Sequence, residues 1–495
     1  MDYGLPAHRE FLRRVRAISV HGLGLSVDIH SPDLPSLRRN LLERQVSPAY
    51  FEIFRNTTSA LASVRNEIVD ARLAYHGEGL WMTQPGVTES VLFRQAVHEA
   101  CEQLHVLQSA WLNHECAAKV FAGYCYGTYL PPLYTRGSAE VVAENAAAVQ
   151  HQIDQQGYLQ NGSRPLVLLE IPPLTYFVAG TLPIPTFFRM ICDQSPCGLV
   201  LDIGHLWTVY RYTGAYQVMS LSRFVEAFLD EFPMNRVVEI HVAGLEVHES
   251  IRALTSQWVA RADGTILPAW TDAHGAPIPP VLFEMLDQVL CHPQLTSLKG
   301  LALEVDTKPT EMIVDEFVEF SRRYAAVFRE SGDSGKIALI CEAKVAPEPF
   351  KSASTKETLE EAYERYVQVL LGKAEPKGPE WNQDPGCTHD LDLYHSLYLP
   401  YEILHWGGAI EDMFVESCRR LRERGIDVEG FVTFWFRDPR PLTDLYDFFL
   451  LKVDRFVAFI REVAPEVETL AAAEAERLRQ AYRVANEPSQ TLQLS

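Results

Sequence analysis

Residue types that bind metal ions follow several short apolar runs of this sequence. In LDIGH, Asp202 and His205 stand three residues apart, directly behind the run GLVL. A carboxylate and an imidazole at this spacing can both ligate a metal ion. The same pair can instead open a helix, with the aspartate capping the first turn. The spacing alone leaves both interpretations open, so matching ligands elsewhere in the chain must decide between them.

Matching groups do stand at comparable positions. Glu170 ends the apolar run PLVLLE, and the loop TDAHGAPIPP contributes an Asp-x-His pair. One divalent ion takes about four to six ligands, so a larger set indicates two or three ions, with a carboxylate such as Glu170 bridging. The nine candidate metal ligands are His76, His114, Glu170, Asp202, His205, His241, Asp272, His274 and Glu304.

The apolar runs have the length of buried strands and alternate with helix-like stretches, which is typical of an α/β protein. Eight parallel strands predict a (β/α)8 TIM barrel, in which functional groups lie at the carboxyl ends of the strands. The predicted helices between strands span 34–44, 88–107, 138–153 and 221–232. The predicted strands are 18–26, 50–54, 72–76, 109–114, 165–170, 198–202, 236–241 and 301–306.

Composition limits the classes of partner. The 44 Lys and Arg against 65 Asp and Glu give a net charge of −21, which argues against nucleic-acid binding. Nine cysteines without a C-x-x-C pair fit a reducing compartment better than a zinc module. The N-terminal residues lack the apolar segment of a signal peptide, and no uncharged apolar run approaches the about 20 residues of a membrane helix. We expect a cytoplasmic protein that binds neither nucleic acid nor membrane.

Seven stretches, in their order and separations, resemble the multinuclear non-heme iron-dependent oxidative enzymes, the family that includes the methanobactin maturase. The resemblance covers about residues 18–330 and is most specific where EIHVAG is followed by DAHGAPIP. The broader xylose-isomerase-like barrel superfamily, with endonuclease IV as its trinuclear zinc member, shares the ligand order. The stretches are AYHGEGL, LNHEC, LLEI, LDIGH, EIHVAG, DAHGAPIP and LEVD.

The resemblance implies how the ligands divide among the ions. Family members often have two asparagines where this chain has Gly204 and His205, so its third set looks more like that of the endonuclease type. Ile171 and Leu245 also depart from the family pattern, near the expected substrate pocket. The second set is the expected catalytic group. The implied sets are His76, His114 and Glu170; then Glu170, Asp202, His241 and Glu304; then His205, Asp272 and His274.

The resemblance also implies oxidative chemistry. Two or three iron ions, with Fe²⁺ and Fe³⁺ together, would use O2 as co-substrate. The substrate would be a cysteine, or in some branches an Asp or Asn, of a ribosomally made precursor peptide, and a small thiol is the other candidate. The family's peptide modifiers commonly work with a separate recognition partner protein. Glu78, Asp306 and Tyr176 are candidates for orienting ligands or carrying protons.

The chain divides into a metal-binding barrel domain over 1–330 and an extension over 331–495 that resembles no family. A strand-like run at 336–345 and a helix at 356–372 begin the extension, and later segments are mostly helical and rich in aromatic residues. The extension can form a helical cap on the barrel or a groove that recognises the peptide. The cysteine and histidines at 387, 389, 395 and 405 match no zinc module, so a structural role is favoured for them.

Two other classes of enzyme use a similar ligand set. A metal-dependent hydrolase or phosphoesterase of the endonuclease IV type would activate water on a phosphodiester. The net charge of −21 opposes it, and AYHGEGL, LDIGH and DAHGAPIP contain no Arg or Lys to hold a phosphate. A sugar isomerase or epimerase normally needs a lysine or paired glutamates after the fifth and sixth strands, and here the sixth ends in Asp202 and His205.

Overall fold

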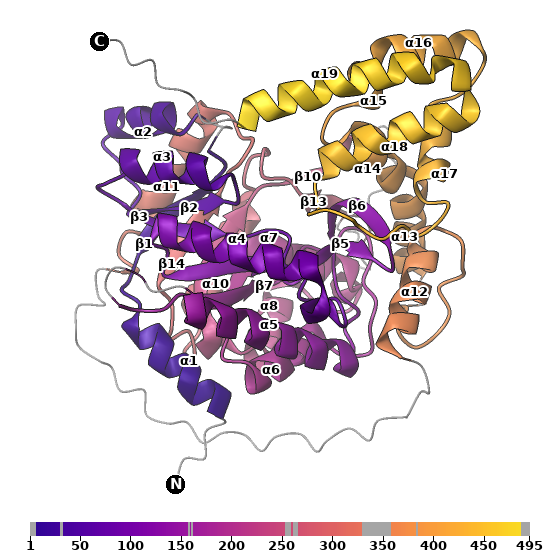
Figure 1. Ribbon diagram of the computed structural model, residues 1–495. Helices are drawn as coiled ribbons and strands as arrows, with labels where there is room; N and C mark the ends of the chain where they lie inside the picture. Colours follow the sequence, from indigo (N-terminus) through magenta and orange to yellow (C-terminus); the bar gives the residue numbers. More distant parts are fainter. Residues whose placement is uncertain are drawn as a thin grey trace, which may run out of the picture.

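Eight parallel strands close into a barrel in the order β1-β14-β9-β8-β7-β4-β3-β2 (Figure 1). The computed structural model describes residues 6–29, 33–156, 159, 162–252, 259–260, 266–328, 358–382 and 385–486. Each strand overlaps one of the eight predicted strands, so the (β/α)8 barrel is confirmed. The strands are β1 Gly22–Val27, β2 Tyr50–Phe54, β3 Arg72–His76, β4 Trp111–Glu115, β7 Leu166–Glu170, β8 Gly198–Asp202, β9 Val237–Ala243 and β14 Gly300–Glu304.

Helices surround the barrel, and the four helices predicted between strands are confirmed as α2, α4, α5 and α8. Serine caps fix two of these starts: the Ser90 side chain accepts from Phe93 N, and Ser220 accepts from Arg223 N. The helices are α2 Leu34–Glu43, α3 Thr58–Glu67, α4 Val91–Leu107, α5 Arg136–Gln156, α6 Ile184–Gln194, α7 Ile203–Tyr212, α8 Leu221–Glu231, α10 Pro280–Leu290 and α11 Thr310–Tyr324.

The amino-terminal end of the barrel is closed by α1, Pro6–Ala17, which lies below the strands in Figure 1. Phe11 and Val15 of this helix are buried in a small apolar cluster with Trp111, Leu168 and other side chains from inside the barrel. The cluster separates the barrel interior from solvent at this end. Among the described residues, the ligand-type side chains of the interior lie above this cluster, toward the carboxyl ends of the strands.

Short hairpins and loops rise from those carboxyl ends. After β4 the chain forms the hairpin of β5, Ala118–Phe121, and β6, Tyr124–Leu130. After β9 it forms β10, Leu245–Val247, which pairs with β13, Trp270–Asp272. These segments raise the wall around the mouth of the barrel and support the helices that follow residue 357. A further two-stranded pair is formed by β11, Val259–Ala260, and β12, Ile266–Leu267.

The described part of the extension is helical, as predicted. It lies beside and above the carboxyl end of the barrel (Figure 1), and its buried apolar side chains belong to one continuous core with those around the barrel. The predicted helix at 356–372 is confirmed as α12, whereas the predicted strand at 336–345 and the domain boundary at 330 lie outside the described residues. The helices are α12 Leu359–Leu370, α13 Pro385–Leu393, the π-helix η4 Tyr394–Tyr398, α14 Leu399–His405, α15 Ile410–Met413, α16 Val415–Glu423, α17 Gly430–Trp435, α18 Phe448–Val463 and α19 Glu468–Asn486.

Buried polar contacts fix the extension to the barrel. The Glu402 carboxylate accepts from Gly127 N and, at 2.6 Å, from Thr128 Oγ1 of β6. A Cβ at Gly127 would lie 2.9 Å from the side chains of Glu402 and Phe448, so this close approach requires glycine. A buried ion pair joins Arg211 of α7 to Asp390 of α13, with oxygen–nitrogen distances of 2.7 and 3.1 Å. The extension therefore caps one side of the barrel mouth as an integral part of the fold.

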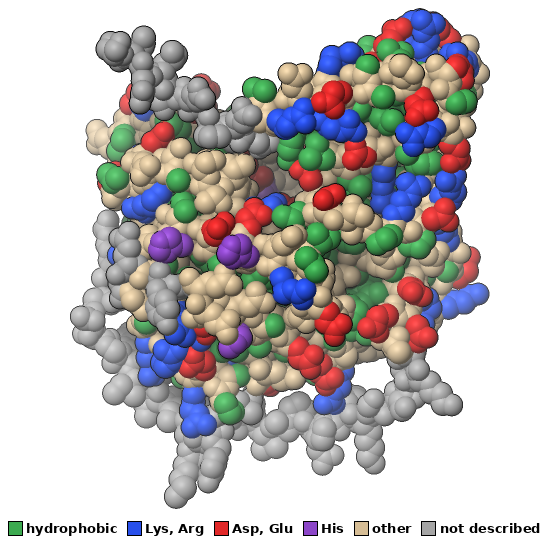
Figure 2. Space-filling view, viewed as in Figure 1, with side chains coloured by type: hydrophobic (Ala, Val, Ile, Leu, Met, Phe, Trp, Pro, Cys, Tyr) green, Lys and Arg blue, Asp and Glu red, His purple; other side chains and the backbone are tan. Residues whose placement is uncertain are grey.

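The surface of the extension carries mixed charge. On the face in Figure 2, basic and acidic side chains are interspersed over the extension. The extension has exposed ion pairs, such as Arg479 with Asp454 and Arg422 with Glu411. Among the helices that the structure describes, none has both the length and the apolar character needed to cross a membrane.

Candidate metal centre

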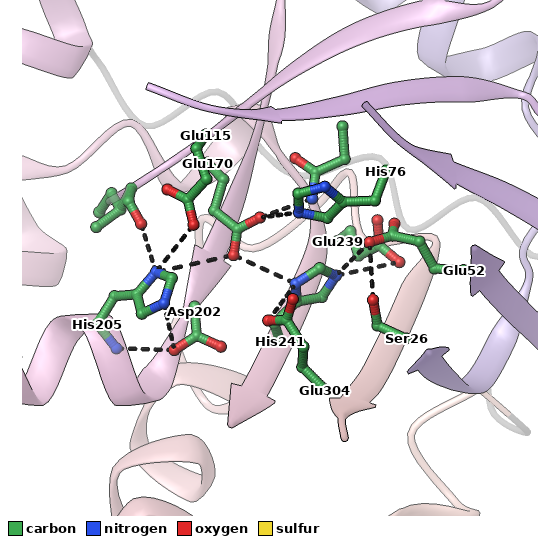
Figure 3. A network of polar contacts seen from close by, with 12 residues as sticks. Ser26, Glu52, His76, Glu115, Glu170, Asp202, His205, Glu239, His241 and Glu304 are labelled. Atoms are coloured by element: carbon green, nitrogen blue, oxygen red, sulfur yellow. Dashed lines mark hydrogen bonds and ion pairs between the residues drawn. The ribbon is translucent and has the colours of Figure 1, made fainter. Parts of the chain in front are cut away.

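Two of the three predicted ligand sets lie together at the carboxyl ends of the strands. Figure 3 shows the first set and His205 of the other. In each set the potential ligand atoms are all within 4.8 Å of one another. The strands β7, β8, β9 and β14 deliver the first set, and α7 with the loop after β9 delivers the other. The sets are Glu170, Asp202, His241 and Glu304, and His205, Asp272 and His274.

His241 lies at the centre of the four-residue set. Its Nδ1 is 3.2 Å from Glu170 Oε1 and 3.4 Å from Glu304 Oε2. All four residues are at most 2% exposed, because their side chains lie at or near the carboxyl ends of barrel strands. A carboxylate and imidazole set of this kind suits a divalent or trivalent transition-metal ion.

The three-residue set is arranged by contacts on the far side of each imidazole. His205 Nδ1 donates to the Ile171 carbonyl at 2.6 Å, so its Nε2 is left facing Asp272 at 3.5 Å. His274 Nδ1 contacts the Asp306 carboxylate, and its Nε2 lies 2.9 Å from Asp272 Oδ2. Metal-bound histidines are usually held in this way, with the second ring nitrogen donating to a carbonyl or carboxylate.

Asp202 caps α7 and still has one carboxylate oxygen available for an ion. Its Oδ1 accepts from His205 N at 2.7 Å and so caps the first turn of α7. Its Oδ2 has no hydrogen-bond partner among the described residues. The helix cap aims one oxygen at the backbone and leaves the other for an ion, so the two interpretations of LDIGH are compatible.

Ligand atoms of both sets lack hydrogen-bond partners in the part of the chain that the structure describes. Buried polar atoms in proteins nearly always have a partner, so a cluster of exceptions needs an explanation. The exceptions within these two sets are nitrogens and oxygens that a metal ion accepts as ligands, and in each set the potential ligand atoms lie within 4.8 Å of one another. The residues therefore fit a metal centre. The atoms are Glu170 Oε1, Asp202 Oδ2, His205 Nε2, His241 Nδ1, Asp272 Oδ1, His274 Nε2 and Glu304 Oε2.

The electrostatic balance also favours a bound cation. Burial opposes the charge of Glu170, but contacts with His241 and His76 outweigh it and hold the pKa of Glu170 well below its usual range. Burial dominates at Asp202 and raises its pKa to about 6, although His205 opposes the shift. Neighbouring carboxylates that are buried together repel one another, and a metal ion between them removes that repulsion.

The remaining predicted set is only partly assembled. His76 Nε2 lies 3.4 Å from Glu170 Oε2. His114, however, uses both ring nitrogens on backbone groups: Nδ1 donates to Glu115 O at 2.6 Å, and Nε2 accepts from Leu80 N at 3.0 Å. Side chains alternate along a strand, and on β4 it is the neighbours of His114 that face the other ligands. The ligand role of His114 stays a prediction.

Glu115 is absent from the predicted ligands because the predicted strand ends at residue 114. In the structure β4 continues to Glu115, which pairs in register with Glu170. The carboxylates of both glutamates lie within 4.8 Å of His205. Asn113, two residues earlier, donates to Glu170 Oε2 at 2.6 Å and orients that carboxylate. The period of two along LNHE is the signal that indicates Asn113 and Glu115.

A cavity of about 470 Å³ lies between the barrel and the extension. Trp81, from the loop after β3, forms one wall, and Leu442 and Tyr446 of the extension form another. The Trp81 ring packs edge-on against both His114 and Tyr446, with ring centroids 6.2 and 5.5 Å apart. Trp81 therefore lines the cavity and also contacts the predicted ligand His114.

Two curated proteins are similar to part of this chain. A UPF0276 protein of Paraburkholderia phytofirmans is 28% identical over 188 residues, which is 37% of this chain and 52% of that protein. A UPF0276 protein of Rhizobium meliloti is 28% identical over 186 residues, 37% of this chain and 48% of that protein. The chain thus spans about half the length of the curated relatives it matches.

Solved structures resemble the chain more distantly. Endonuclease IV from Thermus thermophilus is 15% identical with a TM-score of 0.35, covering 63% of this chain and 100% of that one. A D-allulose 3-epimerase from Methylomonas sp. is 12% identical with a TM-score of 0.35, covering 62% and 99%. Likenesses of this size carry no argument about activity.

The family match is more extensive. The model described as "RiPP precursor modification enzyme MbnB/TglH/ChrH" matches residues 22–321, from the first barrel strand into α11. This range contains every residue of the two assembled ligand sets and well over half of the chain. The chain belongs to the MbnB/TglH/ChrH family of enzymes that modify the precursors of ribosomally synthesised and post-translationally modified peptides.

Proposed function

We propose that this enzyme holds two or three iron ions and uses O2 to oxidise a cysteine of its precursor peptide. One observation carries the proposal: the buried ligand atoms that lack hydrogen-bond partners coincide with two predicted ligand sets. Membership in a family of peptide modifiers supplies the substrate class. The four-residue set would hold one ion and the three-residue set a second, and His76 with Glu170 would contribute to a third.

Bound iron would supply one-electron redox changes and an open position for a thiolate ligand. The chain's own residues set the geometry. Glu170 presents Oε1 toward His241, at 3.2 Å, and Oε2 toward His76, at 3.4 Å, so it would help to hold an ion together with either histidine. Asn113 holds Oε2 in place from the side. The apolar cluster around α1 closes the barrel beneath these residues.

The cavity beside the mouth is the place we propose for an apolar side chain of the peptide. It is lined mainly by apolar residues of the barrel loops and of the extension. Trp81, one of these residues, packs against His114. The extension would in this way take over part of the role of a recognition protein. A separate recognition partner stays a prediction.

The proposal is tested by the metal content and Mössbauer spectrum of anaerobically purified protein, together with O2 uptake. We expect two to three irons per chain, an antiferromagnetically coupled ferric–ferrous pair, and O2 consumption that depends on a cysteine-containing peptide encoded beside the gene. Replacing that cysteine by serine should abolish the uptake. Zinc or manganese without iron, combined with hydrolysis of a phosphodiester or isomerisation of a sugar, contradicts the proposal.

A variant of His205 tests the division of ligands. His205→Asn removes an imidazole whose Nε2 faces Asp272, and it restores an amide common at this position in the family. We expect about one metal equivalent fewer per chain with the others retained, measured by inductively coupled plasma mass spectrometry. As a control, the exposed His98→Asn should leave the metal content unchanged. Loss of all metal, or of none, contradicts the assignment.

A variant of Leu442 tests the peptide site. Leu442→Asp places a charge in the apolar cavity, which costs at least the about 1–2 kcal/mol of a lost leucine contact. We expect KM for the peptide to rise about tenfold or more while metal content and kcat stay unchanged. Val415→Asp, which alters an exposed side chain elsewhere on the extension, is the matched control. An unchanged KM for Leu442→Asp would contradict the proposal that the cavity binds a side chain of the peptide.

A further inference from the structure

A second carboxylate pair lies beneath the metal centre. Glu52 of β2 and Glu239 of β9 are fully buried inside the barrel, one layer below Glu170 and Glu304 (Figure 3). His241 lies between the two layers. Its Nδ1 faces the upper carboxylates, and its Nε2 faces the lower ones, at 3.4 Å from Glu52 Oε1 and 3.6 Å from Glu239 Oε1.

The hydrogen bonds of the two layers differ. Below His241, the carboxylates already accept from protein donors: Ser26 Oγ donates to Glu52 Oε1 at 3.2 Å, and Trp111 Nε1 to Glu52 Oε2 at 3.4 Å. Tyr50 Oη donates to Glu239 Oε1 at 2.6 Å. Above His241, Glu170 Oε1 and Glu304 Oε2 have no hydrogen-bond partner among the described residues. Three of the four lower carboxylate oxygens thus have a protein donor, whereas Glu239 Oε2 and His241 Nε2 have no hydrogen-bond partner among the described residues. Ligand atoms of Glu52, Glu239 and His241 also lie within 4.8 Å of one another, so the donors on the lower oxygens are what distinguishes this layer from the upper one.

The position of the lower layer supports the same division. The apolar cluster that contains Phe11, Val15 and Trp111 closes the barrel beneath it. A metal ion in the lower layer would compete with the Ser26, Trp111 and Tyr50 donors for three of the four carboxylate oxygens. An imidazole N–H does not compete with these donors, because a carboxylate oxygen accepts more than one hydrogen bond.

We propose that Glu52 and Glu239 are positioning residues that receive the Nε2–H of His241 and thereby present its Nδ1 to the metal ion. The inference rests on the proposed metal centre. A carboxylate behind a metal-bound histidine fixes the ring orientation and tautomer and increases the basicity of the ligand nitrogen. Two carboxylates do so from two strands, so β2, which carries none of the predicted ligands, also contributes to the centre.

The test uses full-length protein labelled with ¹⁵N-histidine and loaded with Zn²⁺ as a diamagnetic probe. Long-range ¹H–¹⁵N correlation spectra report which nitrogen of His241 carries hydrogen. We expect Nε2–H, protected from exchange with solvent, and metal-bound Nδ1. Finding Nδ1–H with metal-bound Nε2 overturns the inference without any variant.

Variants measure what the pair contributes. Glu239→Gln and Glu52→Gln should each raise the Kd for Zn²⁺, followed through the His241 signals, about 10–100-fold. Exchange of the Nε2–H should also become faster. Glu402→Gln, which alters a fully buried carboxylate of the extension, is the matched control and should change neither quantity.

The outcomes separate the two proposals. If both glutamine variants keep the wild-type Kd for Zn²⁺ and the wild-type exchange rate of the Nε2–H, the positioning role is wrong. The proposal of a metal centre is not affected by this result. A wild-type protein that binds neither Zn²⁺ nor Fe²⁺ at His241 overturns the metal centre and this inference with it. A higher Kd with an unchanged Nε2–H signal also overturns the inference, because a structural defect alone would produce it.

Discussion

Carboxylates crowd the axis of this barrel, and the structure depends on how their repulsion is offset. Glu52, Glu115, Glu170, Glu239 and Glu304 are each at most 7% exposed and lie in or near two adjacent layers. Burial of a charge without a partner is prohibitive, so each carboxylate needs a proton, a hydrogen-bond donor or a cation. Tyrosine, serine and tryptophan supply donors to the lower layer. The upper layer has imidazoles and a set of oxygens that a metal ion would satisfy.

The rest of the fold serves this arrangement. Parallel strands bring residues that are far apart in sequence to one end of the barrel, and α1 closes the opposite end. The extension covers one side of the mouth through contacts such as Glu402 with β6 and Asp390 with α7. Segments from both halves of the chain therefore form the wall around the mouth of the barrel.

Much of this could be predicted from the sequence because each barrel strand is a short apolar run that ends in a polar residue. The ends of the predicted strands indicate Glu170 and Asp202 directly, whereas Glu304 stands within the last predicted strand, which in the structure ends at this residue. Errors arise where one residue decides the face of a strand: ending β4 at His114 hides Glu115, although the alternation with Asn113 indicates it. Glu52 and Glu239 stand in the middle of apolar runs, where an acidic residue gives no signal of its own.

Docking of the extension could not be predicted in the same way. The Arg211–Asp390 pair joins residues 179 positions apart, and neither residue lies in a periodic pattern that indicates the other. No pattern in the sequence indicates that a glycine is needed at position 127. The need arises because Glu402 and Phe448 of the extension pack closely against it. Contacts of this kind depend on the shapes of two finished surfaces, which local sequence patterns do not describe.

The central claim is that iron occupies the space enclosed by the two ligand sets. Anomalous diffraction from crystals of anaerobically purified protein, measured on both sides of the iron absorption edge, tests this most directly. We predict one iron peak among Glu170, Asp202, His241 and Glu304, and a second among His205, Asp272 and His274. Peaks that appear only at the zinc edge, or iron peaks away from both sets, would contradict the account.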